Sequence, residues 1–385
     1  MRDGQLISCT HETRHVPARR HRSLVAAATA ALLWLVVVVA PAPARHGEAA
    51  DGTGKPAIKR FQLPTVDARP LGLTVGPDGN VWFVEFLGNS VGRITRSGRV
   101  AKFPIPTPNS TPDAIVTGPD GNLWFTEVAG NKIGRITPEG VITEFPVPTP
   151  NAQPTVITAG PDGNLWFTER GRPHPAGAFD VAKVGRITTQ GVITEFEVPT
   201  RGSRPVGIAG GPDGNVWFTL SMVDKVARIT PQGVVTEFPL PRPCPPPRCS
   251  PHEITGGPDG AVWFTEVFGN RIGRITPSGE ITEFDLPHPR SAPNVITRGP
   301  AGTLVFTQSG LTAADDSRIG AMSVDGELVE WDVPLGTAPF GITTGPAGEI
   351  WFAETGTLAT PGETIGLIVG GHGQVTAALK SAHAP

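Results

Sequence analysis

The sequence has 385 residues, and its 32 Lys and Arg residues nearly balance its 35 Asp and Glu residues, which leaves a formal net charge of −3. Because nucleic acids and anionic membranes require a clustered basic surface, this balance argues against both as partners. The 48 glycines and 42 prolines would be typical of low complexity. Here the glycines recur at fixed positions between apolar runs, which indicates the turns of a folded chain.

The N-terminus is typical of a targeting segment. A basic cluster at 19–22 precedes an unbroken apolar run at 24–40, and Ala42-Pro43-Ala44 follows. This order of basic, apolar and small residues predicts a secretory signal peptide over 1–44, with an uncleaved membrane anchor as the alternative. We expect a linker at 45–56. The protein should then be secreted or extracytoplasmic, or held at the membrane by this segment alone.

A repeat dominates the rest of the chain. The ten residues GPDGNLWFTE at 118–127 recur, with variations, from Gly-Pro pairs at 76, 160, 211, 257, 299 and 345. Each period contains four short runs of β-forming residues, as at 112–118, 123–127, 132–137 and 141–148, separated by turn residues. A period of about forty residues with four strands predicts an all-β fold, a seven-bladed β-propeller of four-stranded blades over 57–380.

The ring has one outer strand to spare. The run AIKRFQLP at 57–64 precedes the first copy, and GQVTAAL at 373–379 follows the last. Seven blades need only one of the two. Because a strand from the opposite terminus removes an open sheet edge, we predict that the N-terminal strand closes the ring.

Loop lengths vary on one face only. The connections from first to second strand and from third to fourth strand stay short in every copy. The remaining connections, which share the other face, lengthen at 170–183, 241–251, 309–318 and 355–364. Insertions confined to one face usually mark the binding face of a propeller.

The residue after the proline that opens each first strand should lie on that face, near the central channel. In chain order these residues are Leu71, Asp113, Thr155, Val206, His252, Asn294 and Phe340. Among them only His252 has a side chain suited to act as a base near neutral pH. The alternative is a structural histidine, hydrogen-bonded in the channel mouth. His252 follows Cys244 and Cys249, which at this spacing in an exported chain predict a disulfide that fixes its approach.

Acidic residues close most of the second strands. They are Glu85, Glu127, Glu169, Glu266 and Glu354. We expect such a repeated residue to be structural, accepting backbone N–H groups or pairing with an arginine. A ring of carboxylates could also hold a divalent cation, and Glu266 is a further candidate for the channel mouth. His174 and Asp180, in the longest loop, are candidate metal or substrate contacts.

The repeats resemble the virginiamycin B lyase family over roughly 57–370. The stretches that carry the resemblance are GPDGNLWFTE, GNKIGRITPEGVITEFPVPTP and PHEITGGPDGAVWFTEVFGNRIGRIT. The resemblance implies a seven-bladed propeller and a carbon–oxygen lyase that opens a cyclic depsipeptide of the streptogramin B type by elimination at its ester, with bound Mg²⁺. Such an activity inactivates the antibiotic. The catalytic base of that family falls on His252, within Pro251-His252-Glu253-Ile254-Thr255.

The family's metal ligands match less well. A Glu-Pro-His motif and a later Glu supply them, and these positions fall here on Ala292, Asn294 and Ser309. Alanine offers no ligand atom and serine a weak one, so the residues that would hold the metal are unknown. A site that includes Asp113 or Glu266 would have to replace them.

Two other functions stay open. One is a non-catalytic propeller that binds a peptide, a glycan or another cell-wall ligand on its variable face. The other is a lactonase-like metal enzyme, for which Asp113 and Asn294 supply only part of a ligand set. In each case we expect a monomer that binds a small cyclic peptide or a cell-wall ligand.

Overall fold

The computed structural model describes residues 57–171, 182–244, 248–312, 317–356 and 361–369. The chain divides into two units, residues 1–36 and residues 37–385, and every described residue belongs to the second. The predicted signal segment and linker, His174, Asp180 and the run at 373–379 lie outside the described residues. Within the described ranges, no helix is long and apolar enough to cross a membrane.

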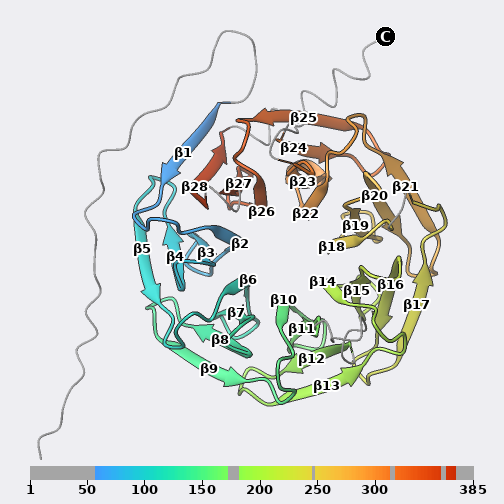
Figure 1. The fold of residues 1–385 in the computed structure, drawn as a ribbon, viewed down its shortest axis with the longest axis horizontal. Helices are drawn as coiled ribbons and strands as arrows, with labels where there is room; N and C mark the ends of the chain where they lie inside the picture. Colours follow the sequence, from blue (N-terminus) through green and yellow to red (C-terminus); the bar gives the residue numbers. More distant parts are fainter. Residues whose placement is uncertain (1–56, 172–181, 245–247, 313–316, 357–360, 370–385) are drawn as a thin grey trace, which may run out of the picture. The chain divides into compact units, whose positions relative to one another are not determined.

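Seven four-stranded antiparallel sheets surround a central axis as the blades of a propeller (Figure 1). The innermost strands are β2 (Pro70–Val75), β6 (Pro112–Thr117), β10 (Pro154–Ala159), β14 (Pro205–Gly210), β18 (Pro251–Gly256), β22 (Pro293–Arg298) and β26 (Pro339–Thr344). The second strands are β3 (Val81–Glu85), β7 (Leu123–Glu127), β11 (Leu165–Glu169), β15 (Val216–Leu220), β19 (Val262–Glu266), β23 (Leu304–Gln308) and β27 (Ile350–Gly356). We number the blades one to seven from β2.

The two outer rows complete the blades. The third strands are β4 (Ser90–Ile94), β8 (Lys132–Ile136), β12 (Lys183–Ile187), β16 (Lys225–Ile229), β20 (Arg271–Ile275), β24 (Ser317–Met322) and β28 (Pro361–Ile368). The outermost strands are β5 (Val100–Pro104), β9 (Ile142–Pro146), β13 (Ile193–Glu197), β17 (Val235–Pro239), β21 (Ile281–Asp285), β25 (Leu328–Val333) and β1 (Ile58–Gln62). A short 3-10 helix (Pro300–Gly302) joins β22 to β23. The predicted fold class is confirmed.

The N-terminal strand closes the ring, as predicted. Blade seven has the order β26-β27-β28-β1, so its outermost strand comes from the other end of the propeller (Figure 1). Side chains support the backbone pairing. Arg60 Nε lies 2.7 Å from Glu354 Oε1, and the ring of Phe61 stacks on Trp351 with centroids 5.6 Å apart.

The repeated decapeptide has a structural explanation. In blade two, Asp120 accepts hydrogen bonds from Trp124 Nε1 at 3.0 Å and from the turn backbone. Trp124 stacks on Phe145 with centroids 5.5 Å apart, and the Arg135 guanidinium lies 5.6 Å from the centroid of each ring. The same stack recurs in blades one, three, four and five. In these five blades the copy therefore ties its turn to the blade interior.

Threonines in the second strands fix neighbouring blades to each other. Thr126 Oγ1 accepts the N–H of Ala114 in its own blade and donates to the carbonyl of Thr155 in the next, at 3.1 and 2.7 Å. Four threonines make the equivalent donation in later blades: Thr168, Thr219, Thr265 and Thr307. These buried bonds hold the inner strands in a defined arrangement around the axis.

Candidate functional site

All seven inner strands begin in the same strained way. The residue before each opening proline has a left-handed backbone, with φ between 41° and 55°; these residues are Arg69, Thr111, Gln153, Arg204, Ser250, Ala292 and Ala338. Such a conformation is unfavourable outside glycine and must be held by its surroundings. Each carbonyl accepts a hydrogen bond at 3.1 to 3.5 Å, from the residue that follows the second strand in blades one to six and from Thr355, near the end of β27, in blade seven.

This arrangement brings three residues of every blade together at one end of the axis. They are the residue before the proline, the residue after it and the residue whose backbone N–H bonds to the carbonyl before the proline. We call these the axial positions. They lie on the face that carries the longer loops, because both connections at that end of each blade are the variable ones. The site is therefore formed by elements from all seven blades.

His252 occupies an axial position at the start of β18. Its ring meets Phe340 of β26 edge-on, with centroids 6.2 Å apart and planes at 86°. Its carbonyl oxygen accepts the hydroxyl of Thr219 at 2.6 Å, which fixes the backbone. Burial, with help from Arg204, lowers the pKa of His252 to about 4, against an opposing hydrogen bond with the Asn294 backbone. The imidazole is therefore neutral at neutral pH.

One nitrogen of this ring is buried and makes no hydrogen bond among the described residues. The side chain of His252 is only half-buried as a whole, but its Nδ1 atom is excluded from solvent. Nδ1 has no hydrogen-bond partner among the described residues. A buried polar atom without a partner is uncommon, which distinguishes Nδ1 from the other nitrogen of the ring, Nε2.

Two carboxyl groups approach the axis from opposite blades. Burial raises the pKa of Asp113, in β6, to about 6, although Arg170 and Arg69 act in the opposite direction. Burial and the charge of Asp113 raise the pKa of Glu253, in β18, to about 8. At neutral pH, Asp113 is thus mostly ionised and Glu253 mostly protonated.

Sequence reasoning missed Glu253 and the arginines at the axis. Glu253 had a signal, because it is the only charged residue at the third position of an inner strand. Arg69 and Arg204 precede opening prolines, and Arg170 follows β11, where its Nε donates to Gln153 Oε1 at 3.2 Å. Burial, Arg170 and Arg248 all lower the pKa of Arg204, so these positive charges are crowded together.

The other predicted mouth residues are Thr155, which occupies an axial position, and Glu266. Thr155 is buried, and its hydroxyl donates to the carbonyl of Gln153 at 3.0 Å. Glu266 does not join the axial positions. It is fully buried at the end of β19, where Oε2 lies 3.7 Å from Arg271 Nε. The second strand lies behind the inner one, so a residue at its last position faces the blade interior.

The repeated glutamates are structural in part: Glu266 and Glu354 pair with an arginine, as expected, whereas Glu127 and Glu169 do not. Glu85 accepts the hydroxyl of Ser90 at 2.6 Å, and Glu354 pairs with Arg60. Both carboxyl oxygens of Glu127 and of Glu169 are buried without a hydrogen-bond partner among the described residues. Among the described residues, no backbone N–H of the following loop donates to these two carboxyl groups.

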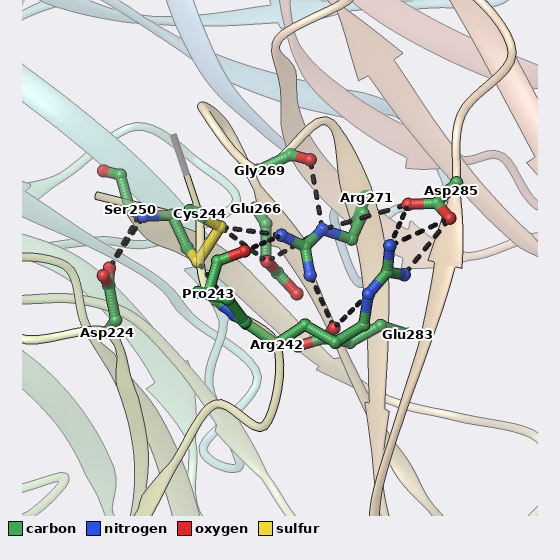
Figure 2. The surroundings of a disulfide bond; sticks show 11 residues. Asp224, Arg242, Pro243, Cys244, Ser250, Glu266, Gly269, Arg271, Glu283 and Asp285 are labelled. Atoms are coloured by element: carbon green, nitrogen blue, oxygen red, sulfur yellow. Dashed lines mark hydrogen bonds and ion pairs between the residues drawn. A yellow bond between two sulfur atoms is a disulfide. The ribbon is translucent and has the colours of Figure 1, made fainter. Parts of the chain in front are cut away.

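A disulfide anchors the loop before His252 (Figure 2). Cys244 and Cys249 are joined, with Cα atoms 5.0 Å apart. Arg271 Nη2 lies 2.8 Å from Cys244 Sγ on one side of the loop. On the other side, Asp224 Oδ1 of blade four accepts the N–H groups of Cys249 and Ser250, each at 3.0 Å. The loop is thus fixed to two blades immediately before the inner strand begins.

The positions expected to hold Mg²⁺ do not fit that ion. Ala292 has no ligand atom. Asn294 Nδ2 donates to Ser309 Oγ at 3.2 Å, and Ser309 Oγ donates to the carbonyl of Pro339 at 2.6 Å. Magnesium prefers carboxylate oxygens, and these side chains supply none. The one metal-capable cluster among the described residues is Cys244, Cys249 and Glu266, where the disulfide occupies both sulfurs.

Comparisons with known proteins agree on one family. The model of the virginiamycin B lyase family matches residues 44–174, 178–244 and 242–359. Selenomethionine-substituted virginiamycin B lyase from Staphylococcus aureus is 38% identical, with a TM-score of 0.71, over 81% of this chain and 98% of that one. A streptogramin B lyase structure is 34% identical, with a TM-score of 0.72, over 83% and 99%.

A third structure is a catalytically inactive histidine-to-alanine variant of the Staphylococcus aureus enzyme with quinupristin. It is 37% identical, with a TM-score of 0.71, over 81% of this chain and 98% of that one. Among curated protein sequences, the comparison found no match. The family model and the identity to solved structures cover most of the propeller, and so this chain belongs to the virginiamycin B lyase family.

Proposed function

We propose that this protein opens a small cyclic depsipeptide of the streptogramin B type by elimination, with His252 as the base. One observation carries the proposal. A histidine that is neutral at neutral pH lies at the axis beside Phe340, in a chain 38% identical to a virginiamycin B lyase. The family relation supports the reaction, and the ring of Phe340 offers an apolar contact for a hydrophobic depsipeptide.

The chemistry assigns a role to each of these groups. The base removes the proton from the carbon next to a carbonyl. The electrons form a carbon–carbon double bond, the adjacent carbon–oxygen bond breaks, and the ester oxygen leaves as a carboxylate. His252 accepts the proton in this step. Because its pKa is low, the imidazole is a weak base, and stabilisation of the developing negative charge must supply much of the rate.

The expected magnesium has no place in this mechanism at the family positions. Ala292, Asn294 and Ser309 provide neutral groups that already bond to one another or to backbone. We therefore propose turnover that does not depend on Mg²⁺ bound there.

A second candidate function is binding without catalysis. It is favoured by the neutral residues at the three metal positions. The ligand would then be a peptide or another cell-wall component held at the axial positions.

We also propose that the protein acts outside the cytoplasm. The basic, apolar and small-residue order of residues 1–44 supports export, and the disulfide between Cys244 and Cys249 suits an oxidising compartment.

The test is incubation of the purified protein with quinupristin, in Mg²⁺ and in EDTA, followed by chromatography and mass spectrometry. Elimination shifts the retention and the fragment ions without a change in mass, whereas hydrolysis adds one water. We expect ring opening that survives EDTA and disappears in His252→Ala. If neither condition gives ring opening but quinupristin still binds, the protein is a binding propeller.

A further inference from the structure

The axial positions are chemically divided around the ring. Blades seven and one supply the apolar side chains Ala338, Phe340, Leu71 and Phe86, although Arg69 of blade one lies over the Phe86 ring at 5.4 Å from its centroid, and blade six supplies the polar Asn294 and Ser309. Blades three and four supply Arg170 and Arg204. His252 lies in blade five, between the two halves. A ligand that fits both halves has an apolar part and a negatively charged group.

The two arginines reach the same region as His252. Arg170 is hydrogen-bonded to Gln153, which occupies the pre-proline position next to that of Arg204 around the ring. The charges of Arg204 and Arg170 both act on His252. The threonine bonds between blades fix the backbone at Val206 and at His252, next to the positions from which Arg204 and the imidazole extend.

Positive charge exceeds negative charge around this group. The charged and titratable groups that face it are Arg69, Arg170, Arg204, Arg248, Asp113 and Glu253. Asp113 is the one mostly ionised carboxylate among these groups. The positive charges that act on it are those of Arg170 and Arg69. A guanidinium has five donors, so bonds made elsewhere still leave donors for an anion.

We infer that Arg170 and Arg204 form a carboxylate-binding pair beside His252, with the apolar part of the ligand over Phe340. The site is one for amphipathic carboxylates. Its role in catalysis rests on the proposed function, whereas its ability to bind a carboxylate does not.

In the elimination, this pair takes the leaving group. As His252 accepts the proton, the electron pair of the breaking carbon–oxygen bond moves onto the ester oxygen, which becomes a carboxylate. Arg170 and Arg204 stabilise that charge as it forms, and bidentate guanidinium–carboxylate bonds suit its geometry. No oxidant, reductant or co-reactant is consumed. The arginines thereby supply charge stabilisation that the residues at the family metal positions do not.

Carboxylate binding is tested with benzoate and, as its neutral match, benzamide, by NMR of the His252 ring in the full chain. The His252 signal is assigned by its loss in His252→Ala. We expect benzoate to bind at least tenfold more tightly than benzamide, and each of Arg170→Gln and Arg204→Gln to remove that preference. Arg204→Gln should also raise the pKa of His252, because a neighbouring positive charge is removed.

The substitutions have built-in controls. Gln153 already occupies the position equivalent to Arg204 with the same left-handed backbone, so glutamine is compatible with that site. Arg99→Gln removes an equal charge from an exposed turn at the opposite end of blade one and should change nothing. Equal binding of benzoate and benzamide, or benzoate binding unchanged in both arginine variants, overturns the inference.

Turnover separates this inference from the proposed function. If quinupristin is opened, we expect each arginine variant to lower kcat at least tenfold with a smaller change in KM, and Arg204→Lys to recover part of it. If quinupristin is not opened but benzoate binding depends on both arginines, the anion site stands and the lyase proposal fails. If quinupristin is opened equally by wild type and by both variants, the arginine pair has no catalytic role and the lyase proposal stands.

Discussion

At the scale of single residues, the blades differ in how they balance a buried carboxyl group. In blade two, burial and then Glu144 raise the pKa of Glu127 to about 8, while Lys132 pairs with Glu144 at 2.8 Å. One lysine thus faces two carboxyl groups. Glu169 of blade three has the same surroundings, and its pKa is also raised to about 8. In both blades the extra carboxyl is mostly protonated at neutral pH.

Two other blades replace the glutamate, whereas burial and then Glu283 raise the pKa of Glu266 in blade five to about 8 as well. Blade six has Gln308 in place of the glutamate, and its Nε2 donates to Glu330 Oε1 at 2.6 Å. Blade four has Leu220 beside the Lys225–Glu237 ion pair. In blade one the outer strand supplies Lys102, which pairs with Glu85 at 3.1 Å. The pattern keeps the number of buried ionised carboxyls close to the number of cations, as their desolvation requires.

The first prediction is that Glu127→Gln stabilises the protein at high pH. The folded-state pKa of Glu127 is raised above its unfolded value, so its contribution to stability is fully present below about pH 4.5 and is lost as the pH rises through about 8. Glutamine stays neutral and can donate as Gln308 does. We expect a gain of about 1 kcal/mol or more at pH 8 and a smaller effect at pH 5, measured by chemical denaturation.

The control for this prediction is Glu139→Gln, which changes an exposed glutamate in the same blade. It should shift stability little at either pH. An equal effect of Glu127→Gln at pH 5 and pH 8 would show that the buried carboxyl does not titrate between these values.

At the scale of elements, the loop between β17 and β18 decides where His252 lies. The disulfide closes a loop with a sequence separation of five, and Arg271 and Asp224 hold its two sides. We predict that the double variant Cys244→Ser/Cys249→Ser lowers the free energy of unfolding by about 2 kcal/mol, from the loop entropy released to the unfolded chain. Urea denaturation without reductant measures it.

The same variant also tests positioning. Because the loop leads directly into Pro251 and His252, quinupristin affinity should fall together with stability. Asp224→Ala keeps the disulfide but removes the acceptor of two backbone N–H groups, and it should give a similar fall in affinity. An unchanged unfolding midpoint in the double cysteine variant contradicts the role assigned to the loop.

The sequence predicted these elements well and the site only in part. Strand positions follow from alternating β-forming runs and from turn residues, which are local signals repeated seven times. His252 was found because it is the one histidine at its repeat position. Arg170 and Arg204 were missed because they belong to different repeat positions, and only the fold brings the residue after β11 close to the residue before β14. The unusual protonation of Glu127 depends on a partner in another strand, Glu144, for the same reason.

At the scale of the whole molecule, closure by β1 makes the ring depend on both ends of the propeller. The sequence indicated this closure because it contains one outer strand more than seven blades need. The contacts that hold it could not be predicted from the pattern. Phe61 stacks on Trp351, and Arg60 neutralises the buried Glu354. In both pairs the two residues lie almost three hundred positions apart in the sequence.

The last prediction is that removal of β1 opens the ring. A chain that begins at residue 64 lacks β1, loses the buried side chains of Phe61 and Leu63, and leaves Glu354 without its arginine. We expect its free energy of unfolding to be at least about 3 kcal/mol lower than that of a chain that begins at residue 57. We also expect it to associate through the exposed edge of β28, which size-exclusion chromatography with light scattering measures.

A synthetic peptide of residues 57–64 separates loss of the strand from general misfolding. Added to the shortened chain, it should restore the monomer and most of the unfolding midpoint, because it can pair with β28 as β1 does. The same peptide with Phe61→Ala should restore less, since it lacks the ring that stacks on Trp351. If the chain that begins at residue 64 is as stable and as monomeric as the one that begins at residue 57, the seventh blade does not need its outer strand, and the ring is held by the six remaining blades and the inner-strand contacts alone.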